Sequence, residues 1–277
     1  MRLTEEVLTA EELRQHYEIE KELGNRLRNS SREERAVLYA QVYDELFRRL
    51  PKHPQLTRTE TEHHQIKVRG HLRLLRPYLT PETVFLEVGA GDCALPLLVA
   101  PLVRKAYGLE VSEEVTRGLP QSDKFQVLIA KGFKIPMPDD SIDVAFSFQV
   151  IEHIHPDDAI DQLQEIYRVL QPGGIYYCIT GNRLYGPNDI SRDFDREPTG
   201  LHLKEYSIMD LLKLFRGTGF RRVRIERMFK GRRIPSPVLP SRILEGVLEC
   251  LPWKLRKPLA RSYLMMRLLG VSVIGVK

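Results

Sequence analysis

The sequence has few of the features that mark secreted or membrane proteins. Only three of its 277 residues are cysteine, at positions 93, 178 and 250, and no two have a C-x-x-C spacing. This argues against a disulfide framework and against a cysteine zinc site. The apolar run at 94–103 is too short to span a bilayer and contains prolines. Residues 1–13 lack the apolar core of a signal peptide. We therefore expect a cytoplasmic protein.

Hydrophobic residues make up 42% of the chain and charged residues 29%, which is the composition of a soluble globular protein. The net charge of +5 is spread unevenly. Residues 221–267 contain 13 Lys and Arg against 3 Asp and Glu, so this basic region lies on an otherwise acidic protein. Two interpretations stay open: contact with an anionic partner, or a solvated face whose arginine stems pack on apolar surface.

The first 80 residues show helical spacing of apolar side chains. Helices are expected at 9–29, 31–50 and 65–77. Ser31 and Glu34 have the spacing of a capping box at the start of the second helix. We interpret residues 1–80 as an N-terminal helical extension.

From residue 83 onward, short β-rich runs alternate with helical segments. This order predicts an α/β fold with a mostly parallel sheet and helices on both faces. Strands are expected at 84–89, 105–112, 125–130, 142–150, 175–180, 220–228 and 270–277. Helices are expected between them at 93–103, 157–170 and 207–220. The core would then comprise 81–228 and 270–277, interrupted by a basic helical insertion at 229–269.

The first predicted strand leads into the turn Glu87-Val88-Gly89-Ala90-Gly91-Asp92 and then directly into a helix. Glycines here permit a sharp turn and close approach of a ligand to the backbone, at the edge where open α/β sheets bind ligands. Glu110, at the end of the next strand, has the position of an acid that accepts ribose hydroxyls. Dinucleotide-binding proteins allow the same G-x-G-x-x-A pattern. The turn alone therefore predicts an adenosine-type cofactor.

Glu87 is an acid inside a predicted buried strand, where an unpartnered charge is costly. A cationic ligand would offset that cost. The alternative is a carboxylate that caps the turn, which we consider the weaker interpretation.

Three further motifs, at 134–144, 148–154 and 168–174, resemble class I S-adenosylmethionine-dependent methyltransferases. The chain looks most like the branch that contains the ubiquinone and menaquinone biosynthesis methyltransferases. The resemblance covers about residues 83–228. It implies a Rossmann-like fold with a seven-stranded, mostly parallel sheet and an antiparallel last strand. It also implies S-adenosylmethionine as cofactor and an N-terminal extension that closes over it.

The resemblance assigns cofactor-binding roles to particular residues. The residues near the methionine portion would be Glu87, Gly89, Ala90, Gly91 and Gln149. The residues around ribose and adenine would be Glu110, Val111, Gly132 and Phe133. The family often has an acid that accepts the adenine amino group, but here Lys131 stands at that position. Recognition of adenine by the backbone of the following residues is then expected.

Methyl transfer mainly requires alignment of nucleophile, methyl group and sulfur. A general base is needed only for a poorly acidic hydroxyl or carbon acid. The loops after the fourth and fifth strands supply candidates. We predict His153, Tyr185 and His202 as catalytic residues, and Asp189, Arg192 and Tyr206 as substrate-binding residues. The alternatives are a structural His153 and a well-hydrogen-bonded surface loop.

No metal site is predicted. His63 and His64 are adjacent, with acids nearby, but no further His or Cys pair has metal-ligand spacing. A solvated helix start is the favoured interpretation of this pair.

Our first hypothesis is S-adenosylmethionine-dependent O- or C-methylation of a small molecule: a metabolite, quinone-like lipid or sugar. A nucleic-acid methyltransferase that uses the basic region is an alternative. It is weakened because the sequence after the fourth strand reads Ser147-Phe148-Gln149-Val150 rather than Asn/Asp-Pro-Pro-Tyr. A third hypothesis is a non-catalytic binding protein that has the same cofactor-binding fold. The 229–269 insertion could serve as a lid, a dimer surface or a peripheral membrane contact, and the oligomeric state stays open.

Overall fold

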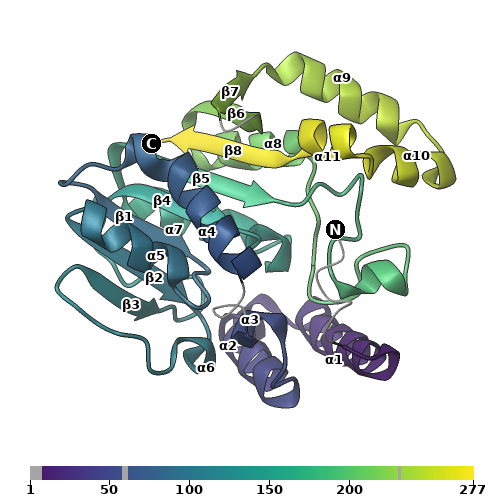
Figure 1. The fold of residues 1–277 in the computed structure, drawn as a ribbon, viewed down its shortest axis with the longest axis horizontal. Helices are drawn as coiled ribbons and strands as arrows, with labels where there is room; N and C mark the ends of the chain where they lie inside the picture. Colours follow the sequence, from purple (N-terminus) through teal and green to yellow (C-terminus); the bar gives the residue numbers. More distant parts are fainter. Residues whose placement is uncertain (1–7, 58–61, 230–231) are drawn as a thin grey trace.

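The computed structural model describes residues 8–57, 62–229 and 232–277 (Figure 1). Its centre is an eight-stranded sheet in the order β3-β2-β1-β4-β5-β8-β6-β7. The strands are β1 (Val84–Val88), β2 (Lys105–Glu110), β3 (Phe125–Ile129), β4 (Ile142–Phe148), β5 (Leu170–Thr180), β6 (Arg221–Phe229), β7 (Arg232–Ser236) and β8 (Val271–Val276). Strands β1 to β5 pair in parallel, whereas β8 is antiparallel to both β5 and β6. The predicted Rossmann-like arrangement is confirmed.

The expected count of seven strands was wrong, because β7 adds an eighth at the edge. It pairs antiparallel with β6 and lies in the 229–269 segment, which was expected to be helical throughout. Judged from the sequence alone, Pro235 argues against a strand at this position. An edge strand tolerates proline, because its outer N–H groups have no partner to lose.

Helices cover both faces of the sheet (Figure 1). One face packs against α7 (Ala159–Val169) and α8 (Ile208–Thr218). The other packs against α4 (Glu62–Leu75) and α5 (Ala94–Val99). Buried residues of α4, including Leu74 and Leu75, share a core with β1 and β4. The segment around α4, grouped with the N-terminal extension from its sequence, is therefore a layer of the core.

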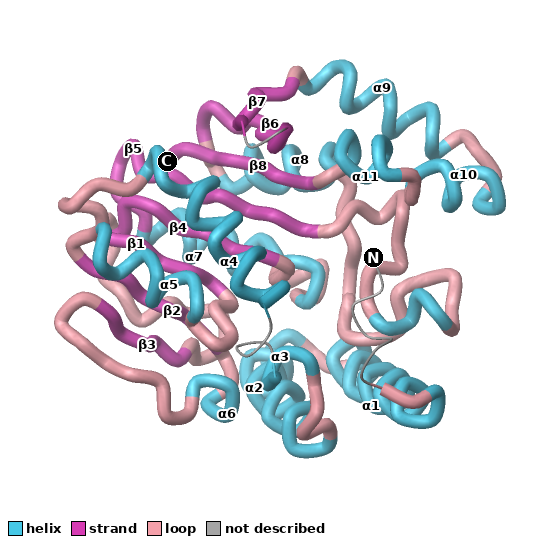
Figure 2. The backbone as a smooth tube through the Cα atoms, in the orientation of Figure 1, coloured by secondary structure: helices cyan, strands magenta, loops and turns pink. Residues whose placement is uncertain are grey.

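The N-terminal helices α1 (Ala10–Asn29) and α2 (Arg32–Arg49) pack against each other and lie apart from the sheet (Figure 2). The predicted capping box of Ser31 and Glu34 starts α2 and is confirmed. The short helix α3 (Pro54–Thr57) follows.

A buried ion pair fixes α2 on the core. Arg35 donates to both carboxylate oxygens of Asp158, at 2.5 Å from Nε and 2.9 Å from Nη2. The Tyr39 hydroxyl also donates to Asp158, at 3.0 Å. Both charged side chains are almost fully buried. Moving α2 away would leave a buried charge without its partner, so the pair holds α2 in one position.

The C-terminal helices α9 (Val238–Glu249), α10 (Trp253–Ala260) and α11 (Tyr263–Leu269) pack together beside the loop after β5. The remaining short elements are α6 (Glu113–Thr116), η2 (Arg76–Tyr78), η3 (Ala100–Leu102), η4 (Ile151–His153) and η5 (Ile190–Asp193). Among the described residues, no helix has both the length and the apolarity needed to cross a bilayer.

Candidate active site

The glycine turn follows β1, where the strand order reverses between β1 and β4, the usual ligand position in such sheets. Gly89 and Gly91 have φ values of +67° and +55°, in the left-handed region that favours glycine. A Cβ added to Gly89 would lie 2.4 Å from Val150 Cγ2, whereas one added to Gly91 would meet nothing within 4 Å. Gly89 therefore allows the next loop to pack, and Gly91 leaves space for a ligand.

Two adjoining cavities open at this turn, and we call them the apolar cavity and the polar chamber. The residues that line both are Tyr43, Gln55, Gly89, Gly91, Gln149 and His153. The apolar cavity extends over β2 and is also lined by Tyr39, Phe47, Leu109, Glu110, Val111, Gly132, Phe133, Ile135 and Gln162. The polar chamber extends toward α1 and the loop after β5, and is also lined by His16, Glu20, His53, His64, Lys67, His71, Glu87, Ala90, Asp92, Asp189, Arg192 and His202.

All nine predicted cofactor-binding residues lie along these two cavities. Three aromatic residues of α2 that cover the apolar cavity were missed: Tyr39, Tyr43 and Phe47. Their four-residue spacing places them on one face of a helix, which is a signal that the sequence offered.

Glu110 is held by backbone groups at the floor of the apolar cavity. Its carboxylate accepts the N–H of Gly91 and the N–H of Val111, both at 2.8 Å. Burial raises the pKa of Glu110, and these backbone N–H groups oppose the rise. Each carboxylate oxygen has a further lone pair, so the residue can also accept ribose hydroxyls.

Glu87 is buried in the wall of the polar chamber, and its Oε2 has no hydrogen-bond partner among the described residues. Burial raises the pKa of Glu87 well above its usual range, and the nearby Asp92 and Glu110 raise it further. Lys67 lowers this pKa and offsets part of the cost, but a buried carboxylate oxygen stays costly unless a further cation or donor joins it. The site therefore fits a ligand with a positively charged amino group.

The sequence predicted a solvated helix start at His64. This residue does lie in the first turn of α4, but its side chain is not solvated. Its Nε2 lies 2.9 Å from Asp92 Oδ2, and both side chains are mostly buried. The pairing crosses from α4 to the glycine turn, so the sequence held no local signal for it.

Lys131 stands where the family often has an acid at the predicted adenine end of the site. Lys131 is exposed and does not line the apolar cavity, whereas Gly132 and Phe133 do. On α7, Gln162 also lines this cavity, and its Oε1 is a buried acceptor with no partner among the described residues. Sequence reasoning missed Gln162, because one amide on a helix carries no distinctive pattern.

The loop after β4 brings two predicted residues to the junction of the cavities. Gln149 has φ +57°, and its amide, oriented to suit its neighbours, donates to Glu152 and accepts from the N–H of Gly181, both at 3.1 Å. His153 Nδ1 donates to the carbonyl of Leu201 at 3.1 Å. Burial lowers the pKa of His153 to about 3, so its ring is neutral at pH 7 and a weak base.

His202 lies in the polar chamber with its Nδ1 2.9 Å from Glu205 Oε1. Burial lowers the pKa of His202, but the hydrogen bond to Glu205 and the nearby Glu152 and Asp189 outweigh this effect and raise the pKa to about 9. The imidazole is therefore protonated at pH 7 and acts as a donor.

The predicted substrate-binding residues Asp189, Arg192 and Tyr206, and the predicted catalytic residue Tyr185, divide into two groups. Asp189 and Arg192 line the polar chamber, and Asp189 also organises its loop by accepting the N–H of Ser191 and of Gly200. Tyr206 is fully buried in the core, and Tyr185 packs against the C-terminal helices. Neither tyrosine lines either cavity. Tyr206 is buried as part of the core, and Tyr185 is partly buried against the C-terminal helices.

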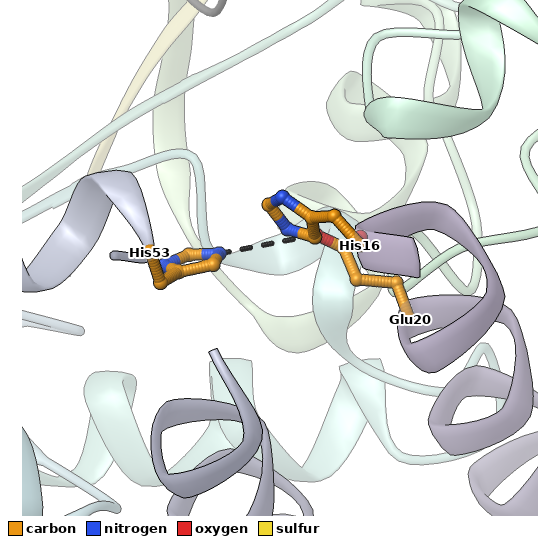
Figure 3. Close-up of side chains that lie close together, drawn as sticks. All are labelled: His16, Glu20 and His53. Carbon is orange, nitrogen blue, oxygen red and sulfur yellow. Dashed lines mark hydrogen bonds and ion pairs between the residues drawn. The ribbon is translucent and has the colours of Figure 1, made fainter. Parts of the chain in front are cut away.

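The N-terminal segment contributes a cluster that the sequence did not reveal (Figure 3). His16 and Glu20 of α1 and His53 after α2 have possible ligand atoms within 4.8 Å of one another. All three line the polar chamber. Six of the chain's eight histidines line this chamber: His16, His53, His64, His71, His153 and His202.

The chain is similar to known methyltransferases. Residues 86–178 match the family described as methyltransferase domain. A probable S-adenosylmethionine-dependent methyltransferase of Mycolicibacterium smegmatis is 34% identical over 140 residues, which is 49% of this chain and 51% of that protein. The human tRNA N(3)-cytidine methyltransferase METTL6 is 25% identical over 201 residues, which is 63% of this chain and 70% of that protein. The chain spans about half the length of the mycobacterial relative.

Solved structures show the same fold. The complex of the Haloferax volcanii Trm112 methyltransferase activator with a methyltransferase aligns with a TM-score of 0.52 and 18% identity, over 89% of this chain and 99% of that one. A methyltransferase from Thermotoga maritima aligns with a TM-score of 0.51 and 17% identity, over 95% and 99% of the two chains. The likeness to the quinone-biosynthesis branch stays a prediction. The fold, the glycine turn and the match at residues 86–178 thus agree in making the chain similar to class I S-adenosylmethionine-dependent methyltransferases.

Proposed function

We propose that this protein transfers the methyl group of S-adenosylmethionine to a small molecule held in the polar chamber. The observation that carries the proposal is the meeting of two chemically different cavities at Gly89, Gly91 and Gln149. A donor in the apolar cavity and an acceptor in the polar chamber would face each other at this junction. Alignment of this kind supplies much of the rate of a methyl transfer.

The residues of the apolar cavity fit the adenosine portion of the cofactor. The aromatic side chains of α2 line it, and Glu110 would hold the ribose. Glu87, whose buried Oε2 has no hydrogen-bond partner among the described residues, would bind the cofactor's ammonium group. When bound, S-adenosylmethionine supplies a methyl carbon that its positive sulfur already activates.

The chamber's lining favours an acceptor rich in hydroxyl groups over a quinone-like lipid. Histidines, Glu20, Asp189 and Arg192 offer hydrogen bonds in several directions, and polar groups placed in this way fix the orientation of a polar ligand. Among the expected acceptor classes, a sugar or another hydroxylated metabolite fits best.

Transfer to RNA is a second candidate, supported by the basic region 221–267 and by the likeness to a tRNA methyltransferase. A base would have to leave its stack to reach the chamber. Among the described residues, Phe148 and Tyr43 are the phenylalanine and tyrosine that line the chamber, and they come from β4 and α2.

Calorimetry with S-adenosylhomocysteine tests cofactor binding, with Glu110→Ala as a variant that should lose it. The acceptor class is tested by incubating the protein and methyl-labelled S-adenosylmethionine with separate polar-metabolite, lipid and RNA fractions. Label in the polar-metabolite fraction, absent with Glu110→Ala, supports the proposal. Label confined to RNA would establish the second candidate, and absence of cofactor binding would favour a non-catalytic protein.

A further inference from the structure

His16 and Glu20 are one helical turn apart on α1 and face the polar chamber together (Figure 3). His16 Nε2 lies 2.7 Å from Glu20 Oε1, and both side chains are about nine-tenths or more buried. His53 Nε2 lies 3.9 Å from the same oxygen. A buried carboxylate that holds one nitrogen of an imidazole is the arrangement that orients a histidine base.

The hydrogen bonds fix where the ring protons are. Burial raises the pKa of Glu20, but the hydrogen bond from His16 and the nearby His53 outweigh this effect and hold the pKa well below its usual range. The carboxylate is therefore ionised and only accepts, so His16 donates from Nε2. In the neutral ring the lone pair is then on His16 Nδ1.

The same reasoning decides between a base and a metal site. The N–H of Gln55 donates to His53 Nδ1 at 3.2 Å, which leaves the ring proton of a neutral His53 on Nε2, facing Glu20. A metal ion at the centre of the cluster would need unprotonated nitrogen at both inward-facing Nε2 atoms. The cluster is arranged to hold protons on these atoms instead.

We propose that His16 is the general base of the methyl transfer, acting on a hydroxyl of the acceptor, with Glu20 and His53 as positioning residues. This inference rests on the proposed function. The acceptor O–H proton moves to His16 Nδ1 while the oxygen bonds to the methyl carbon and the carbon–sulfur bond breaks. The products are a methyl ether, S-adenosylhomocysteine and an imidazolium that Glu20 stabilises.

Other histidines of the polar chamber are less suited to this role. His202 is protonated at pH 7, and His153 is a weak base. Burial lowers the pKa of His71 to about 3, so it is also a weak base.

The test uses the full chain with His16→Gln, Glu20→Gln and the control His63→Gln, whose side chain is exposed and outside the chamber. Transfer of label from S-adenosylmethionine to the polar-metabolite fraction should fall by about 10²- to 10⁴-fold in His16→Gln, the usual contribution of a general base. Binding of S-adenosylhomocysteine and the melting temperature should stay at wild-type values. Added imidazole should partly restore transfer in His16→Ala, which loss of a structural residue would not allow.

Long-range proton–nitrogen NMR spectra should show His16 protonated at Nε2 in the wild type, with Glu20→Gln altering this tautomer. Unchanged transfer in His16→Gln overturns the inference. The inference is also overturned if the protein binds one equivalent of Zn²⁺ or Mn²⁺ that is lost in His53→Ala and is required for transfer. Failure of the wild type to bind S-adenosylhomocysteine would instead overturn the proposed function, so the two failures are distinguishable.

A separate observation concerns the C-terminal helices. Of the 14 large hydrophobic side chains that are exposed in the described part of the chain, nine lie between 234 and 266. On α9, Leu239, Ile243 and Val247 follow one another at four-residue spacing and are 65%, 57% and 58% exposed. The buried residues of α9, including Glu245 and Leu248, are on its opposite face. Contiguous exposed apolar surface of this kind marks a binding site.

Charge surrounds this apolar surface. Helices α9 to α11 carry the exposed or half-exposed cations Arg242, Lys254, Arg256, Lys257, Arg261 and Arg267, against one exposed acid, Glu249. Two aromatic rings lie under cations: Trp253 under Lys257 Nζ at 4.8 Å, and Tyr263 under Arg267 at 4.6 Å. Apolar side chains flanked by basic and aromatic residues are typical of helices that lie in a lipid interface.

We infer that the α9–α11 face docks on an anionic lipid surface. RNA would use the cations but not the apolar stripe, and a second copy would bring two basic faces together. The full chain should sediment with phosphatidylcholine vesicles that contain phosphatidylglycerol, and at least about ten-fold less with pure phosphatidylcholine, as expected for anchoring by basic residues.

The double variant Ile243→Glu, Val247→Glu should lose this binding, whereas Leu98→Glu, exposed on α5, should keep it. Equal sedimentation of the double variant and the wild type overturns the inference. A wild-type dimer in light scattering that the double variant abolishes would establish a second copy as the occupant, and RNA binding that requires the same two residues would establish RNA.

Discussion

Gln162 is expected to recognise the 6-amino group of adenine. Its Oε1 is buried in the apolar cavity with no partner among the described residues, while Lys131, at the family's usual acidic position, faces solvent. An amino N–H of adenine would satisfy this acceptor. A neutral hydrogen bond contributes about 0.5–1.5 kcal/mol net. Its loss in Gln162→Leu should therefore weaken S-adenosylhomocysteine binding by about two- to thirteen-fold.

Calorimetry with two ligands isolates this interaction: S-adenosylhomocysteine, and an analogue with hydrogen in place of the 6-amino group. The wild type should prefer the adenine ligand by about the same two- to thirteen-fold. Gln162→Leu should bind both equally, and Gln162→Glu, which keeps an acceptor, should retain the preference. Gln164→Leu is the matched control, because Gln164 is exposed on the same helix. A full preference for adenine in Gln162→Leu would refute the reasoning.

Three further predictions follow from the structure. Gly91→Ala and its control Gly118→Ala each put an alanine in the left-handed region, so each should lower the free energy of unfolding by about 1 kcal/mol. Only Gly91→Ala should also reduce cofactor affinity at least about ten-fold, a loss of about 1.4 kcal/mol, because its methyl group enters the cavity. Equal affinities of the two variants in calorimetry would contradict this prediction. Arg35→Ala leaves Asp158 buried without its cation and should lower the free energy of unfolding in urea by about 3–5 kcal/mol, so a loss below about 1 kcal/mol would show that the pair is not buried in solution. The pKa of His202 in the folded protein is about 9, above its value in the unfolded chain. Its stabilising effect should therefore be complete below about pH 6.5 and be lost as pH rises through 9. Urea titrations at both pH values should show this loss in the wild type and a smaller one in His202→Gln.

The core was predictable because its signals are local. The strand Val84–Val88 is buried at every residue, and apart from Glu87 its sequence is an apolar run that ends at turn residues. The strand Arg232–Ser236 was missed, because its formation depends on pairing with β6 and its own residues include a proline. Pairing between strands is a tertiary property that a five-residue pattern does not contain.

The candidate site shows the same division. Glu87, Gly91 and Glu110 belong to one strand–turn–helix unit and the strand after it, so their spacing predicts their meeting. His16 and His53 reach the chamber only because the N-terminal helices dock on the core. No spacing in the sequence encodes that docking.

This difference between the core and the segments that flank it limits what similarity to other proteins indicates about the acceptor. The family match covers 86–178, which contains the glycine turn and Glu110. His16, Glu20, His53, Asp189 and His202, which face the polar chamber, are all outside it. Under the proposed function, the glycine turn and Glu110 that would hold the methyl donor lie in the shared core, whereas the acceptor wall comes from flanking segments that can diverge independently. The relatives that align to this chain include one named for a tRNA and one named for a sterol. Acceptor preference should therefore be traced through the history of the N-terminal helices and the loop after β5, rather than through the core.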